Sequence, residues 1–172
     1  GVTVRHLLNH TSEGNPGAVH NYNGNRYGHL GGVMEAVTGK SFADLLGERF
    51  IIPLGMTDTA VNPLDSWSGV AVEGMEGLGR VLGWGDSVTN FPDVYNRLAQ
   101  PYQFDDQYNI VPGMYHLTHS PAAGGLSSVA DLARFDIALD NGELLGEAAY
   151  REMLAPSVRT VQYRPDLAYA LG

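Results

Sequence analysis

Two pairs of histidines in this sequence are spaced closely enough to be candidate metal ligands. His6 and His10 stand four residues apart, which would place both imidazoles on one face of a helix, as in zinc proteases. Those enzymes carry a glutamate directly after the first histidine, whereas this chain has a leucine there. We therefore expect His6 and His10 to pack a helix and cap a turn. His116 and His119 lie in an extended, Pro-flanked loop, and we do not expect them to bind a metal either. We predict no metal ligand and no cofactor.

Serine nucleophiles need a neighbouring group that accepts the hydroxyl proton, and a Ser-x-x-Lys pair is one way to supply it. The one lysine of the chain, Lys40, has Val37 three residues before it, so this pair is absent. Ser12 and Ser127 lie outside any Gly-x-Ser-x-Gly turn, and helix capping accounts for Ser127. Cysteine is absent as well, which excludes a thiolate nucleophile and disulfides. The sequence therefore predicts that this chain does not contain a nucleophile of its own.

Composition narrows the class of protein. A chain of 172 residues with 44% hydrophobic residues can form one domain with a buried core. The net charge of −9 makes nucleic acid an unfavourable partner, because an acidic surface repels phosphates. No apolar run approaches the roughly 20 residues that cross a bilayer. Composition alone leaves the compartment open.

The elements that would position reactive side chains are mostly helical. Thr3 can cap a short helix over residues 4–10, and residues 11–22 form a loop rich in Asn, Gly and Pro. Apolar residues recur every three or four positions over residues 25–38, which predicts a longer helix. Gly39 is expected to end it in the left-handed conformation.

The next segments are less regular. Ser41 begins a capping-box pattern that predicts a helix up to Phe50. Glycines interrupt every helical pattern in residues 62–120, where we expect several short helices lining a cleft, one of them over residues 88–98.

The C-terminal third returns to regular patterns. Ser128 is expected to cap a helix that ends near residues 141–142, and a short helix is predicted over residues 147–154. Alternating apolar residues in 159–171 predict strands. Two of the predicted helices should turn apolar faces inward: Phe42, Leu45, Leu46 and Phe50 in the earlier one, and Val129, Leu132, Phe135, Ile137 and Leu139 in the later one.

Three stretches in order carry a family likeness. They are residues 2–12 (VTVRHLLNHTS), residues 22–27 (YNGNRY) followed by a helix and residues 53–59 (PLGMTDT), and residues 120–135 (SPAAGGLSSVADLARF). Together they resemble the serine β-lactamase and penicillin-binding-protein family, which includes class C β-lactamases, D-amino-acid peptidases and related esterases. The resemblance covers most of the chain apart from residues 62–118.

The resemblance implies an α+β fold in which a helical cluster faces an antiparallel sheet backed by helices, with the active site between them. Residues 1–172 would be a single partial domain, mostly α, that holds the helical subdomain and lacks much of the sheet. Tyr22 takes the place of the tyrosine in the family's Tyr-x-Asn triplet and would relay protons, although from the residues alone it is a loop tyrosine anchoring a turn. Gly24 stands where that triplet has Asn, as in many esterase-like members. Gly24 and Asn25 would line the substrate cleft.

The resemblance also places the missing chemistry elsewhere. In this family a Ser-x-x-Lys helix comes some tens of residues earlier, and a His-x-Gly or Lys-Thr-Gly strand comes later. We expect both outside residues 1–172, so the isolated chain should be inactive. The whole protein would open an amide, lactam or ester in a small-molecule or peptide-like substrate through an acyl-serine, in a periplasmic or secreted location. Two alternatives remain: a non-catalytic module that binds peptidoglycan or a protein partner, and a purely structural helical domain.

Overall fold

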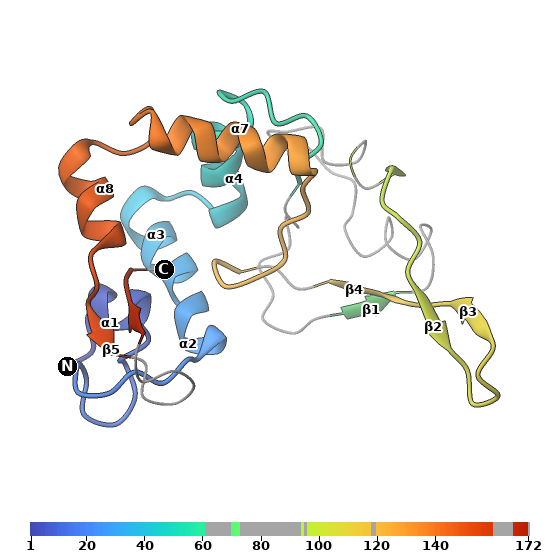
Figure 1. Ribbon diagram of the computed structural model, residues 1–172, viewed down its shortest axis with the longest axis horizontal. Coiled ribbons are helices and arrows are strands. Elements are labelled where there is room, and N and C mark those ends of the chain that lie inside the picture. The colour runs from blue at the N-terminus through green and yellow to red at the C-terminus, as the bar shows by residue number, and fades with distance from the viewer. Residues whose placement is uncertain (61–69, 73–93, 95, 118–119, 160–166, 172) are drawn as a thin grey trace.

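The structure, a computed structural model, describes residues 1–60, 70–72, 94, 96–117, 120–159 and 167–171. Helices from both halves of the sequence gather on one side of the molecule, and strands β1 to β4 lie on the other (Figure 1). The described strands form small antiparallel pairs. The expected α+β architecture, mostly α, is therefore confirmed. None of the helices in these ranges combines the length and apolarity that a bilayer crossing needs.

Helix α1 (Val4–Leu8) begins where its cap was predicted. The His6 N–H donates to the Thr3 hydroxyl at 3.4 Å, and the Thr3 N–H donates to His6 Nδ1 at 3.2 Å. The helix ends two residues earlier than expected. His10 has a φ of 53°, which lies in the left-handed region and cannot continue a right-handed helix.

Two helices occupy the stretch where one was predicted. Helix α2 (Gly24–Gly28) and helix α3 (Leu30–Thr38) are separated at His29. Glycines at positions 28, 31 and 32 explain the break, because each weakens a helix interior by about 1 kcal/mol relative to alanine. Gly39 ends α3 with a φ of 70°, which confirms the predicted left-handed C-cap.

Helix α4 (Phe42–Leu46) follows directly and continues into a π-helical turn, η1 (Gly47–Ile51). The Asp44 N–H donates to the Ser41 hydroxyl at 3.1 Å, as the capping pattern predicted. This segment supplies much of the main core, because its side chains pack against the chain that follows it. The buried members of that core are Ala43, Ile51, Met56 and Ala60, surrounded by Leu46, Leu54, Val94, Leu98, Leu126 and Phe135.

Helix α7 (Val129–Asp140) lies across the helical side and leads to helix α8 (Glu147–Leu154) (Figure 1). Ser128 caps α7 as predicted, but the predicted inward face is wrong for three of its five residues. Val129, Leu132 and Ile137 are 85%, 55% and 60% exposed. The residues that α7 buries are Asp131 and Ala138. Long-range hydrogen bonds from Asp58 and Thr59 to the Asp131 carboxylate set this rotation.

Strands, not short helices, make up most of the regular structure in the described part of residues 62–120, so the expectation of several short helices was wrong there. Strand β1 (Val70–Val72) pairs with β4 (Tyr115–Leu117), and β2 (Tyr102–Phe104) pairs with β3 (Ile110–Pro112), both antiparallel. The turn between β2 and β3 closes on the Asp105 carboxylate, which accepts from the backbone N–H groups of Gln107 and Asn109 at 2.9 and 2.8 Å. The helix predicted over residues 88–98 lies largely outside the described residues.

The strands predicted over residues 159–171 are confirmed in part, and residues 160–166 lie outside the described residues. Strand β5 (Val158–Arg159) pairs with β6 (Ala168–Tyr169), and the Ser157 N–H donates to the Tyr169 carbonyl at 2.8 Å. The Leu171 N–H donates to the carbonyl of Met153 in α8 at 3.1 Å. These contacts bring the end of the chain back to the N-terminal helices, beside the loop that carries Tyr22.

Candidate active site

Tyr22 lies in the loop between α1 and α2, and its neighbours on both sides are fixed by His10. The Asn21 N–H donates to the His10 carbonyl at 2.8 Å, and the Asn23 N–H donates to His10 Nδ1 at 3.1 Å. The rings of Tyr22 and His10 have their centroids 4.4 Å apart. Tyr22 is nevertheless 58% exposed. The loop therefore holds its backbone firmly while it leaves the phenol accessible.

Glu13 fixes the same loop from its outer side. The side-chain amides of Asn21 and Asn23 both donate to the Glu13 carboxylate, and Arg26 Nε lies 3.6 Å from Glu13 Oε1. The Arg26 guanidinium also donates to the Ser12 carbonyl at 3.1 Å. A charged acceptor strengthens such hydrogen bonds, so this network adds rigidity on both sides of Tyr22.

An open pocket of about 220 Å³ lies beside Tyr22. Its walls come from the loop after α1, from α2, from the turn before α7 and from β6. The lining residues are His10, Tyr22, Tyr27, Pro121, Ala122 and Tyr169. None of these six has a carboxylate, ammonium or guanidinium group. The pocket is therefore lined by aromatic rings and three phenol hydroxyls, with no fully charged side chain.

The three phenols differ in their surroundings. Burial raises the pKa of Tyr27, with a smaller contribution from Tyr22. Burial also raises the pKa of Tyr169, with smaller contributions from Tyr27 and Tyr22. Both groups therefore stay protonated at neutral pH and can donate hydrogen bonds into the pocket. Tyr22 is the one of the three that is mostly exposed.

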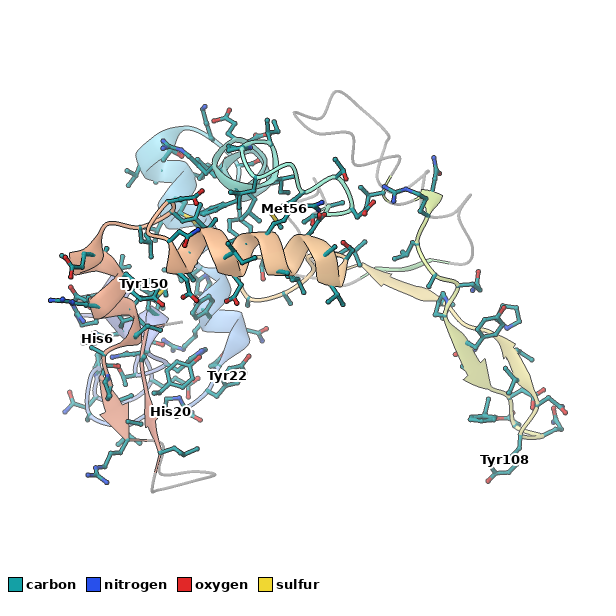
Figure 2. The ribbon with its side chains drawn as sticks, turned by 45° about the horizontal axis from the view of Figure 1, so that its top comes forward. His6, His20, Tyr22, Met56, Tyr108 and Tyr150 are labelled. Carbon is teal, nitrogen blue, oxygen red and sulfur yellow. The ribbon has the colours of Figure 1, made fainter. Side chains whose placement is uncertain are left out.

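Two buried histidines lie behind the pocket. His10 stacks on Tyr27 with centroids 5.2 Å apart and meets His20 edge to face at 5.9 Å. Burial lowers the pKa of His10, and His20 lowers it further; burial also lowers the pKa of His20. Among the described residues neither ring nitrogen of His20 has a hydrogen-bond partner. Figure 2 shows His20 and Tyr22 in the same region of the helical side.

The residues predicted for the site are partly brought together. Tyr22 lines the pocket, and Gly24 stands behind its wall, where an added Cβ would lie 3.8 Å from the Cβ of Ala122. Asn25 is exposed and is not among the lining residues. Sequence reasoning missed His10, Tyr27 and Tyr169 as parts of the site. His10 and Tyr169 are far apart in sequence, and their rings meet because strand β6 lies beside the loop that follows α1.

The other candidate side chains have structural partners. His6 caps α1, as expected, and the Ser127 hydroxyl shares a hydrogen bond of 2.8 Å with the Thr59 hydroxyl. In the ranges that the structure describes, no group of three or more His, Cys, Asp or Glu side chains is arranged to hold a metal ion.

Comparisons with known proteins identify a family and a fold. The model of the Beta-lactamase family matches residues 1–171. A D-stereospecific amidohydrolase from Streptomyces sp. has a similar structure, with a TM-score of 0.69 and 20% identity over 99% of this chain and 55% of its own. A D-amino acid amidase from Ochrobactrum anthropi SV3, complexed with D-phenylalanine, gives a TM-score of 0.59 and 19% identity over 98% of this chain and 52% of its own.

A third similar structure is the octameric penicillin-binding protein homologue from Pyrococcus abyssi, with a TM-score of 0.67 and 19% identity over 99% of this chain and 42% of its own. The chain thus spans about half the length of the solved structures it matches. A comparison with curated proteins gives no match. These similarities show a β-lactamase/transpeptidase-like fold, of which the described residues form helices and small antiparallel sheets.

Proposed function

We propose that this chain, which belongs to the Beta-lactamase family, supplies the tyrosine side of the active site of a serine hydrolase. The whole protein would open an amide, lactam or ester through an acyl-serine intermediate. The serine and its lysine would come from a segment outside residues 1–172. The isolated chain would then be inactive.

The observation that carries this proposal is the combination of restraint and exposure at Tyr22. A catalytic group must be held in its reactive geometry before the substrate arrives, because ordering it during the reaction raises the barrier. The backbone on both sides of Tyr22 is hydrogen-bonded to His10, yet 58% of the residue remains exposed. A loop tyrosine that only anchored a turn would bury its ring instead.

In the proposed reaction Tyr22 moves a proton. A phenol ordinarily loses its proton near pH 10, so a relay needs an ammonium group close by, which the lysine would supply. The ionised Tyr22 oxygen would take the proton of the serine hydroxyl as the serine oxygen bonds to the substrate carbonyl carbon. The same proton would pass to the leaving group as its bond to that carbon breaks.

The surroundings of Tyr22 suit an uncharged substrate group, small or peptide-like. The pocket beside it carries aromatic rings and no side chain with a full charge. Gly24 and Asn25, at the start of α2, would border the same cleft. The similar amidohydrolase and amidase support an amide as substrate, and Gly24 in place of asparagine supports an ester; the periplasmic or secreted location stays a prediction.

Substitution of Tyr22 by phenylalanine in the whole protein tests the proposal. With a chromogenic ester or D-amino-acid amide, we expect kcat to fall by about 10²- to 10⁴-fold, the usual contribution of proton transfer, with little change in KM. Tyr108→Phe is the matched control, because it removes a phenol hydroxyl at an exposed position outside the pocket. If both variants keep the wild-type kcat, Tyr22 is not the relay. If the whole protein binds peptidoglycan and shows no turnover, the alternative of a non-catalytic binding module is correct.

A further inference from the structure

We propose that His10 is the positioning residue for Tyr22, holding the phenol in place through an uncharged imidazole. This inference rests on the proposed function, because it gives His10 a role in the reaction of Tyr22. His10 acts through Tyr22 and does not itself need to touch the substrate.

The first observation is that His10 contacts the Tyr22 segment at three points. Its carbonyl oxygen accepts the Asn21 N–H at 2.8 Å, and its Nδ1 accepts the Asn23 N–H at 3.1 Å. Its ring lies against the Tyr22 ring at a centroid distance of 4.4 Å. One residue therefore fixes the chain before Tyr22, the chain after it and the side chain itself.

The second observation is the backbone of His10. Its φ of 53° is in the left-handed region, which few residues other than glycine adopt, although histidine, like Asn and Asp, does so more often than other types. The residue is only 4% exposed, so this conformation is held by packing on all sides. The left-handed turn directs the imidazole back toward residues 21–23 immediately after α1 ends. Strained backbone of this kind is concentrated at functional sites.

The third observation concerns the proton on the ring. An imidazole nitrogen accepts a hydrogen bond only when it carries no hydrogen, so the Asn23 contact requires a neutral His10 with its proton on Nε2. The groups that face His10 are His20, Tyr22, Tyr27 and Tyr169, and none of them is a carboxylate that would stabilise an imidazolium. Protonation at Nδ1 would replace an acceptor by a donor opposite the Asn23 N–H and release that side of the loop.

His20 provides a matched control in the same cluster. It is also 4% exposed and packs its ring against His10 and Tyr169. In the described part of the chain, however, its ring nitrogens have no hydrogen-bond partner. A phenyl ring at position 20 would keep the packing and remove nothing that holds Tyr22.

The experiment compares His10→Asn, His10→Phe and His20→Phe in the whole protein by steady-state kinetics with a chromogenic ester. An asparagine oxygen can replace Nδ1 as acceptor, and asparagine tolerates a positive φ. We expect His10→Asn and His20→Phe to keep kcat within about threefold of wild type. His10→Phe keeps a ring but loses the acceptor, and we expect its kcat to fall by about tenfold or more with KM nearly unchanged, since a tenfold change corresponds to the loss of about one hydrogen bond.

The pH profile adds a readout that simple destabilisation would not change. Burial and His20 lower the pKa of His10, so wild-type kcat should be kept at the ordinary histidine value of about 6.5 and should decline only at a lower pH, where His10 takes up its proton. This decline should be absent in His10→Asn, whose amide does not titrate. Circular dichroism and thermal melts of each variant identify any loss of fold.

The results separate this inference from the proposed function. A wild-type kcat in folded His10→Phe, or a loss in His10→Asn equal to that in His10→Phe, would overturn the inference even if Tyr22→Phe is inactive. Persistence of the acidic decline in His10→Asn would overturn it too. If His10→Phe does not fold, the rate and pH profile of His10→Asn decide. A fully active Tyr22→Phe would instead overturn the proposed function, and the inference with it.

Discussion

The carboxylate of Asp131 accepts a hydrogen bond from the hydroxyl of Thr59 at 2.8 Å, across 72 positions of sequence. The same oxygen accepts the Asp58 N–H at 2.7 Å, and the other oxygen pairs with Arg134. Asp131 is fully buried, so these contacts tie the first turn of α7 to the turn that follows η1. The segment just before α7 carries Pro121 and forms one pocket wall. Asp131 therefore helps to fix the position of Pro121 relative to the N-terminal helices.

Substitution of Asp131 by alanine should destabilise the whole protein. The change would remove the acceptor of the part-buried Asp58 N–H, one of the two partners of the Thr59 hydroxyl and the partner of Arg134. Loss of hydrogen bonds to a buried charged acceptor lowers the free energy of unfolding by about 1–3 kcal/mol when the groups left behind are partly exposed, and urea denaturation measures this change. Asp136→Ala, at an exposed position of the same helix, should change it by about 0.5 kcal/mol or less. Equal effects of the two substitutions would contradict this prediction.

Two glycines that face the same turn should respond differently to alanine. At Gly24 an added Cβ would lie 3.8 Å from the Ala122 Cβ, which is ordinary contact, whereas at Gly31 it would lie 3.3 Å from Pro121 Cδ. The proline ring cannot swing away as a flexible side chain can. We expect Gly24→Ala to raise the free energy of unfolding by about 0.4–1 kcal/mol and Gly31→Ala to lower it by about 1–3 kcal/mol. Gly31→Ala should also reduce turnover, because the added methyl group would displace Pro121, which lines the pocket. A stabilising Gly31→Ala would contradict this prediction, because it would show that the turn at Pro121 can move without cost.

The comparison of sequence and structure shows where local chemistry suffices. Thr3, Ser41 and Ser128 cap their helices as predicted, because each cap involves residues within three positions of one another. Gly39 adopts its predicted left-handed conformation for the same reason. The family likeness also gave the fold class, since its motifs record the order of these local elements.

Features set by distant contacts were not predictable in this way. The apolar periodicity of α7 pointed Val129 and Leu132 inward, but the buried carboxylate of Asp131 rotated the helix otherwise. Likewise, no spacing in the sequence indicates that the ring centroids of His10 and Tyr169 lie 5.3 Å apart in the site. The β2–β3 hairpin was missed because a three-residue strand leaves little alternation to detect, and its turn depends on the side chain of Asp105.

The turn of the β2–β3 hairpin offers a stabilising substitution. Tyr108 has a φ of 61°, and its side chain is on the surface at 85% exposure, so it bears left-handed strain with little packing in return. Asparagine adopts this conformation more readily, and Tyr108→Asn should raise the free energy of unfolding by about 0.5–1 kcal/mol. Tyr102→Asn makes the same chemical change within β2, where asparagine is a poor strand former, and should not stabilise. Urea denaturation of both variants checks the prediction, and a stabilising Tyr102→Asn would contradict it.

The buried histidines should make folding stability depend on pH in a mildly acidic window. Burial lowers the pKa of both His10 and His20, whereas in the unfolded chain each titrates near 6.5. The unfolded state therefore binds more protons below pH 6.5, and stability that is fully present above this value is lost as the pH falls toward the lower folded values. Each histidine can contribute a slope of at most about 1.4 kcal/mol per pH unit. Because carboxylates titrate near pH 4, urea denaturation between pH 5.5 and 7.5, roughly, isolates the histidines. His20→Phe should roughly halve the slope, and an unchanged slope would mean that His20 is already protonated in the folded protein or titrates there as it does when unfolded.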